Sequence, residues 1–86
     1  MAKKRRENYR ENFASLSIKI PWKYFKDILI KDFGFEIVNK SGSVRVFVRE
    51  EVRFTVHEPH GRGHDFVSKI DRQKAIQALE ALGLLE

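Results

Sequence analysis

The chain has no cysteine, only two prolines and no long hydrophobic run. Without cysteine it cannot form a disulfide scaffold, a thiolate zinc site or a cysteine nucleophile. No apolar stretch approaches the roughly 18 residues that a transmembrane helix needs, so we expect no membrane partner. The charged N-terminus lacks the apolar segment of a secretory signal, and we therefore expect a cytoplasmic protein. With 86 residues, the chain has room for one domain.

Acidic residues are outnumbered by basic ones, 12 against 17, which gives a formal net charge of +5. More than half of this excess lies in residues 1–12, which contain Lys3, Lys4, Arg5 and Arg6. We predict a basic disordered tail over residues 1–12. Such a tail attracts phosphate groups by releasing counterions, without reading a base sequence. The alternative is a solvated tail that only adds solubility.

Residues 13–20 mix helical and strand spacing, and we predict that they form an arm packed on the domain. A single domain is predicted for residues 21–86. Pro21 suits the first turn of a helix, because the N–H that proline lacks would have no helical partner there. Gly34 ends the predicted helix. Between them, apolar residues recur at spacings of three and four: Trp22, Phe25, Ile28, Leu29 and Phe33.

Three strands are predicted after this helix, over residues 35–40, 44–49 and 52–57. The second and third alternate apolar and polar residues, which is typical of antiparallel strands with one buried face. A last helix is predicted to be capped by Asp71 or, through a capping box, to start at Ser68. We therefore predict an α+β fold: a two-layer α-β-β-β-α domain whose three-stranded antiparallel sheet carries two helices on one face.

Matching the apolar faces predicts how the second and third strands pair. With Val48 opposite Val52, six apolar side chains form one core face: Val44, Val46, Val48, Val52, Phe54 and Val56. A two-residue loop at Glu50-Glu51 would mix the faces, so we predict a longer hairpin loop. The same register predicts that Ser43 lies opposite His57.

The predicted solvent face of this hairpin carries three arginines, Arg45, Arg49 and Arg53, around Phe47. Guanidinium groups pair with phosphates and an aromatic ring stacks on a base, so this face is a candidate RNA-binding surface. Two alternatives need no ligand: the arginine stems cover Phe47, or the arm at 13–20 lies over it. A protein partner is a further alternative, because an aromatic residue among arginines also marks interface hot spots.

Three histidines, His57, His60 and His64, lie close together in the sequence beside Glu58 and Asp65. Their spacing matches no zinc signature, and we expect no metal and no cofactor. Histidine titrates near neutral pH, so one of the three is a candidate general acid or base for cleavage of RNA by its own 2′-hydroxyl group. The alternative is that all three are solvated loop residues.

The order of short motifs from Trp22 to Leu84 resembles the HicA family of toxin–antitoxin toxins. Four motifs carry the resemblance: Phe33-Gly34-Phe35, Gly42-Ser43, Val56-x-x-Pro59-His60-Gly61 and Leu79-x-x-Leu82-Gly83-Leu84. The resemblance implies a fold like that of double-stranded-RNA-binding domains. It also implies an RNA-binding ribonuclease toxin that cleaves mRNA and is silenced by a HicB-type antitoxin protein.

The chain departs from the family at Val44, where the resemblance places a histidine that drives cleavage. His57, His60 and Ser43 are the remaining catalytic candidates. Three hypotheses stay open: an RNA-binding domain without cleavage, an endoribonuclease that uses His57 or His60, and a module that binds an antitoxin-like protein. The sequence also leaves the oligomeric state open.

Overall fold

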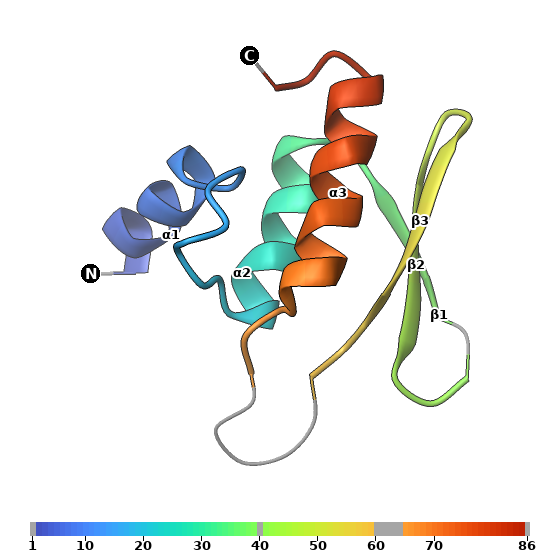
Figure 1. The fold of residues 1–86 in the computed structure, drawn as a ribbon, viewed down its shortest axis with the longest axis horizontal. Coiled ribbons are helices and arrows are strands. Elements are labelled where there is room, and N and C mark those ends of the chain that lie inside the picture. Colours follow the sequence, from blue (N-terminus) through green and yellow to red (C-terminus); the bar gives the residue numbers. More distant parts are fainter. Residues whose placement is uncertain (1, 40, 60–64, 86) are drawn as a thin grey trace.

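The computed structural model describes residues 2–39, 41–59 and 65–85. Three antiparallel strands and two helices behind them form an α+β domain, so the predicted fold class is confirmed (Figure 1). One further helix precedes this unit. The elements, in chain order, are α1 (Ala2–Glu11), α2 (Trp22–Asp27), the π-helical turn η1 (Ile28–Asp32), β1 (Glu36–Asn39), β2 (Val44–Arg49), β3 (Val52–His57) and α3 (Lys69–Ala81).

The first predicted helix consists of two parts, α2 and η1. Pro21 precedes the first turn in extended conformation, with φ −62° and ψ 147°. At the other end the N–H of Phe33 donates to the carbonyl oxygen of Ile28, five residues back, which is the π-helical pattern. Gly34 then takes a φ of +72°, a conformation that glycine adopts without steric cost, and this ends the helix as the sequence predicted.

The strands form a sheet in the order β1-β2-β3, but the predicted register of the hairpin is wrong by one residue. Val48 lies opposite Arg53, and Phe47 lies opposite Phe54. Only Glu50 and Glu51 connect the two strands. Because side chains alternate along a strand, this shift moves every side chain of β2 to the other face of the sheet.

Aromatic packing accounts for the observed register. Phe47 is fully buried, and its ring stacks on that of Phe54 with centroids 5.4 Å apart. The ring of Phe47 also packs edge-on against Trp22 and Phe25, and Val46 stays 6% exposed on the other face, so the observed register gains aromatic packing while that valine remains buried. The tight loop that this register requires is possible because Glu50 takes a positive φ of 54°. Phe47 is therefore a core residue and not an exposed stacking platform.

The sheet face opposite the helices, which we call the outer face, is consequently lined by valines. It carries Val38, Val44, Val46 and Val48, with Glu36, Arg53, Thr55 and His57 around them. No helix of the described residues covers this side of the sheet (Figure 1). Val44 was predicted to face the core, and it lies here instead. The position where the HicA resemblance places a histidine is therefore on the open side of the sheet.

Helix α3 packs against the other face of the sheet, beside α2 (Figure 1). Of the two predicted starts, the Ser68 start is correct, because the Ser68 hydroxyl accepts the N–H of Asp71 at 3.2 Å and caps the helix. The buried side of α3 is formed by Ala75, Ala78 and Leu79. This face closes the core over Phe25, Ile28, Leu29, Phe35, Phe47, Phe54 and Val56.

Residues 1–12 were predicted to be a disordered tail, and this prediction is wrong, since Ala2–Glu11 form α1. The helix lies on the side of α2 that faces away from the sheet (Figure 1). Its Arg6 reaches two carboxylates there, that of Asp27 at 2.6 Å and that of Asp32 at 3.2 Å. The positive charge of this segment is visible in the sequence, but its pairing with the acidic residues of α2 and η1 is not.

Residues 13–20 run from α1 to α2 as an irregular arm whose two ends, Phe13 and Ile20, are almost fully buried. The carbonyl oxygen of Ile20 accepts the N–H of Val67 at 3.0 Å, and the N–H of Trp22 donates to the backbone carbonyl oxygen of Asp65 at 2.7 Å. These bonds join the start of α2 to the segment that leads into α3. They place one end of the arm beside the first turn of α3.

Candidate nucleic-acid interface

Two of the predicted RNA-binding arginines, Arg45 and Arg49, lie on the helix side of the sheet and are engaged within the protein. Arg45 pairs with Glu58 at 3.1 Å and donates to the carbonyl oxygens of Gly42 and Val44. Arg49 donates to the carbonyl oxygen of Phe33 at 2.6 Å. Both guanidinium groups therefore stabilise the fold. The predicted arginine–phenylalanine surface does not exist.

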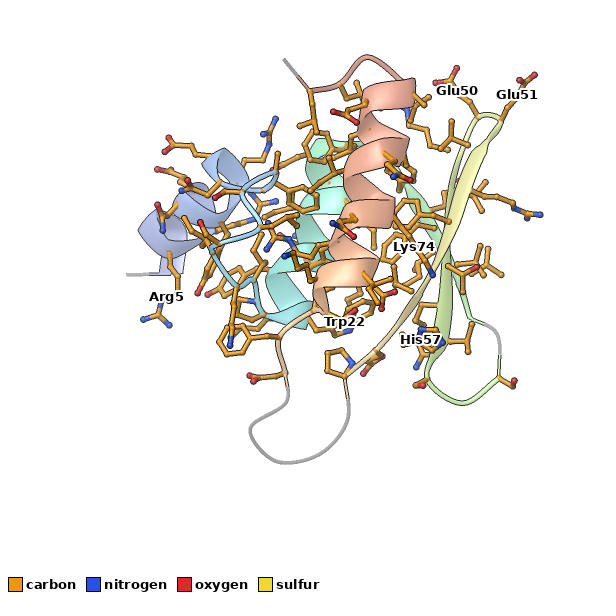
Figure 2. All side chains as sticks on the ribbon, viewed as in Figure 1. Arg5, Trp22, Glu50, Glu51, His57 and Lys74 are labelled. Atoms are coloured by element: carbon orange, nitrogen blue, oxygen red, sulfur yellow. The ribbon has the colours of Figure 1, made fainter. Side chains whose placement is uncertain are left out.

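The other predicted RNA-binding residues are spread over different surfaces. Arg53 is exposed on the outer face, while Lys3, Lys4 and Arg5 belong to α1. Arg5 is exposed and extends away from the body of the protein on the side where α2 begins at Trp22 (Figure 2). Arg6, by contrast, is occupied by Asp27 and Asp32.

His57 is the one histidine for which the structure gives a position, since His60 and His64 lie outside the described residues. Its side chain is 61% exposed, and its Nδ1 atom lies 3.8 Å from the buried carboxylate of Asp71. The backbone N–H of His57 donates to the same carboxylate at 3.0 Å. Ser43, the third catalytic candidate, is half-buried, and the residue opposite His57 is Val44 and not Ser43 as predicted.

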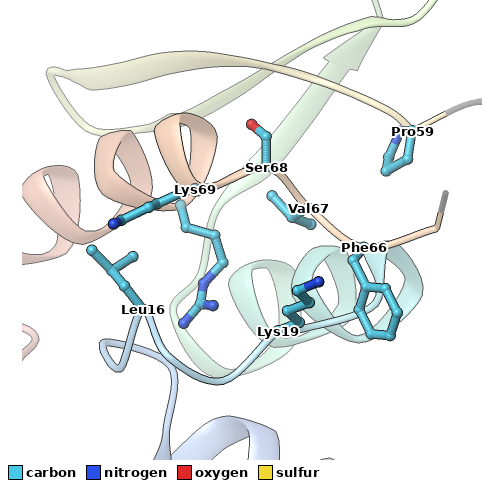
Figure 3. A pocket seen from close by; sticks show the side chains of 8 residues that line it. Leu16, Lys19, Pro59, Phe66, Val67, Ser68 and Lys69 are labelled. Carbon is cyan, nitrogen blue, oxygen red and sulfur yellow. The ribbon is translucent and has the colours of Figure 1, made fainter.

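A group of cations that the sequence reading missed lies where the arm meets the start of α3. Lys19 and Lys69 line one pocket of about 410 Å³ together with the exposed ring of Phe66 (Figure 3). Lys23 is exposed in the first turn of α2. Pro21, just before that turn, pairs with Phe66 in an isolated β-bridge. We call Lys19, Lys23, Lys69 and Phe66 the basic end.

The lysines of the basic end carry charge that no acidic residue of the described chain pairs with. Within the described residues, Lys19, Lys23 and Lys69 form no ion pair. Asp65 is the exposed acidic residue of the same segment. The helix α3 also begins here, and its dipole adds partial positive charge. The surface therefore attracts anions.

Arg72 adds a fixed cation to the wall of the same pocket. It is 2% exposed, and burial lowers the pKa of its guanidinium group below the usual value. Its partners are the backbone carbonyl oxygens of the arm, at Phe13, Ser15 and Ile18 among others. Arginine keeps its proton throughout the physiological range, so the pocket keeps this positive charge.

The sequence does not show that Lys19 and Lys69 belong to one surface, because more than half of the chain separates these two lysines. Backbone hydrogen bonds between residues 20–22 and 65–67 bring their segments together. One sequence signal was present for Lys69, because it directly follows Ser68, the predicted cap at a helix N-terminus. In this respect the basic end differs from the charge run at residues 3–6, which was visible in the sequence.

Clusters of other kinds are not seen in the part of the chain that the structure describes. There, no three His, Asp or Glu side chains gather as metal ligands would. Among the same residues, no helix combines the length and apolar character needed to cross a membrane. A scan of family models, a search of curated proteins and a search of solved structures gave no match to this chain.

Proposed function

We propose that this protein is an RNA-binding domain that holds the phosphate backbone at its basic end. The observation that carries the proposal is the convergence of Lys19 and Lys69 on one pocket, from segments far apart in the chain and without acidic partners among the described residues. The resemblance of the sequence to HicA toxins supports the same class of ligand.

Each residue of the basic end has a defined task in this proposal. The lysines contact phosphate oxygens and release counterions, which gives affinity without reading bases. Phe66, whose side chain is 43% exposed beside them, offers a ring on which an unpaired base stacks. Single-stranded RNA fits this combination best, because its bases are free to leave the helical stack.

Fluorescence anisotropy with a labelled single-stranded RNA at several salt concentrations tests the proposal. Affinity is expected to fall steeply as salt rises. Replacing Lys19 and Lys69 with alanine removes two phosphate contacts, so the slope of log K against log salt is expected to decrease by about 1.4. Phe66→Ala is expected to weaken binding by roughly tenfold while leaving the slope unchanged.

Arg53→Ala is the control for charge, because this arginine is exposed on the outer face, away from the pocket, and forms no ion pair with the residues that the structure describes. It removes the same charge and is expected to change affinity much less than the Lys19 and Lys69 substitutions. An equal loss for each charge removed at positions 19, 53 and 69 would show that binding follows net charge alone. Absence of RNA binding at low salt would refute the proposed function.

Endoribonuclease activity is the second candidate function, and the pairing of His57 with Asp71 favours it. A carboxylate beside Nδ1 orients an imidazole ring so that the other nitrogen faces the solvent as a base. In this mechanism His57 takes the proton of a 2′-hydroxyl group, whose oxygen attacks the neighbouring phosphorus while the bond from phosphorus to the 5′-oxygen breaks. The leaving 5′-oxygen takes a proton from water, so the products carry a 2′,3′-cyclic phosphate and a 5′-hydroxyl end. The experiment is a denaturing gel of end-labelled RNA incubated with the protein in EDTA.

Under this second hypothesis His57→Ala abolishes cleavage, whereas Ser43→Ala retains it, because Val44 and not Ser43 lies opposite the histidine. Intact RNA with the unmodified protein excludes the hypothesis and leaves binding as the function. Cleavage that persists in the His57→Ala protein assigns the reaction to another residue.

A further inference from the structure

The outer face has the composition of an interface. Val38, on the edge strand β1, is 49% exposed and lies directly opposite Val46 of the central strand. Val46 is 6% exposed yet does not belong to the hydrophobic core, so its shielding comes from neighbours on its own face. A strip of valines on the open side of a sheet is the kind of apolar patch that marks an interaction surface.

Two opposite charges flank Val48 in one row across the sheet. Glu36 lies opposite Val48 on β1, and Arg53 lies opposite the same Val48 on β3. Both charged residues are exposed, and neither forms an ion pair with the residues that the structure describes. The row therefore reads negative, apolar, positive from one edge of the sheet to the other.

We propose that the outer face binds a second copy of this chain. When two such faces meet about a two-fold axis that runs along the strands, β1 of one copy lies over β3 of the other. Glu36 then faces Arg53 of the second copy, and Arg53 faces its Glu36. Two identical ion pairs thus form around a centre in which Val46 and Val48 meet their own counterparts.

The charge pattern selects this orientation over the other symmetric one. A two-fold axis across the strands would place β1 over β1, which leaves both glutamates at one edge and both arginines at the other. That arrangement brings like charges together and is therefore disfavoured. The axis along the strands also keeps the basic ends of both copies at the same end of the dimer, because β2 runs in the same direction in each.

The interface is small, so the dimer is weak. Strands about 4.8 Å apart and up to six residues long, at about 3.3 Å per residue, give a face of roughly 300 Å². Stable complexes bury about 800 Å² on each partner. We therefore expect dimers at high micromolar concentration in the absence of RNA. One RNA strand that contacts both basic ends would bind more tightly than a single domain does.

Sedimentation equilibrium without RNA, from about 10 μM to about 1 mM protein, tests the proposal. Val38→Lys is expected to abolish the dimer, because it places a charge beside the Val46 side chains that meet at the centre. Glu36→Arg and Arg53→Glu each turn the attractive pairs into repulsive ones, and each is expected to weaken the dimer by about tenfold. The double variant Glu36→Arg/Arg53→Glu restores both pairs and is expected to regain the original dissociation constant.

Glu80→Arg is the control for charge, since Glu80 is exposed on α3, on the side of the sheet opposite the outer face. It is expected to leave the dimer unchanged, and circular dichroism confirms that each variant is folded. A monomer throughout the concentration range would overturn the proposal. Single reversals that do not weaken the dimer would overturn it equally. Because no RNA is present, these outcomes are independent of the proposed function.

Discussion

The guanidinium group of Arg72 on α3 donates a hydrogen bond to the backbone carbonyl oxygen of Phe13, 59 residues earlier in the chain. Both side chains are almost completely buried. The same guanidinium also donates to the carbonyl oxygens of Ser15 and Ile18. One side chain thus holds the whole irregular arm against α3, and through the arm it fixes the position of α1.

Arg72 is a buried cation whose hydrogen-bond partners, in the described residues, are backbone oxygens. Carbonyl dipoles replace the water that the charge loses on burial, and the charge in turn provides donors for carbonyls that no helix or strand satisfies. The arm lacks regular backbone pairing over most of its length. Its conformation therefore depends on this side chain.

Replacing Arg72 with leucine is expected to destabilise the protein by about 2–4 kcal/mol, because the buried carbonyl oxygen of Phe13 and the part-buried ones of Ser15 and Ile18 lose this donor. Arg72→Lys is expected to lose most of the same stability, because one ammonium group cannot reach oxygens spread along the arm. Urea denaturation followed by circular dichroism measures both. Arg5→Leu removes an exposed arginine and is expected to change stability by less than about 0.5 kcal/mol. Equal effects at positions 5 and 72 would contradict this account.

Docking of α1 is expected to weaken in acid. The hydrogen bond from Arg6 lowers the pKa of Asp27 below its usual value, with a smaller contribution from Lys31, while burial acts in the opposite direction. A carboxylate whose pKa is lower in the folded state stabilises the fold above its unfolded pKa, which is about 4. That contribution is lost as the pH falls through the folded value.

The size of this effect is at most about 1 kcal/mol, because both side chains are partly exposed and screened by water. Urea denaturation at pH 7, 5 and 3 compares the original protein with Asp27→Asn. The original is expected to lose more stability between pH 5 and pH 3 than the variant does. Asp65→Asn, which changes an exposed carboxylate outside these contacts, is expected to behave like the original. A pH dependence that Asp27→Asn leaves intact would show that other carboxylates govern it.

The hairpin loop is expected to become more stable when Glu50 is replaced with glycine. Glu50 has a φ of 54°, which costs about 1–2 kcal/mol for a residue with a β-carbon. Glycine avoids this strain but has more freedom in the unfolded chain, so the expected gain is about 0.5–1 kcal/mol. Thermal unfolding is the measurement.

Glu51 is the internal control for that experiment, since it neighbours Glu50 in the loop and is not among the positive-φ residues of the described chain. Glu51→Gly adds freedom to the unfolded chain without relieving strain, and it is expected to lower the melting temperature. If both substitutions shift the melting temperature in the same direction, the loop does not have the two-residue geometry described above.

Local patterns predicted the elements of the domain well. Pro21, the apolar spacing from Trp22 to Phe33 and Gly34 define the first helix, because helix ends follow from backbone chemistry within a few residues. The alternation in residues 44–49 and 52–57 likewise defined β2 and β3. It did not define which face is buried, because both faces of the hairpin contain apolar side chains and a one-residue shift exchanges them.

The candidate site was predicted less well for a related reason. His57 was identified by residue type, but its partner Asp71 lies on another element, and the residue opposite it in the sheet was misassigned. The sequence predicts that Arg45 and Arg49 are available to a ligand, because their partners, Glu58 and the Phe33 carbonyl, face them only in the folded protein. A charge pattern shows where cations are, and not which of them are already paired.

By itself, the sequence determined the α+β class, the ends of most elements and the basic character of the protein, since these depend on local propensity and composition. Tertiary structure alone decided that Phe47 enters the core, that the valines of β2 face outward and that Arg6 and Arg72 fasten the N-terminal segment. It also brought Lys19 beside Lys69. Each of these outcomes results from contacts between distant segments, where burial of large apolar side chains and satisfaction of polar groups outweigh local pattern.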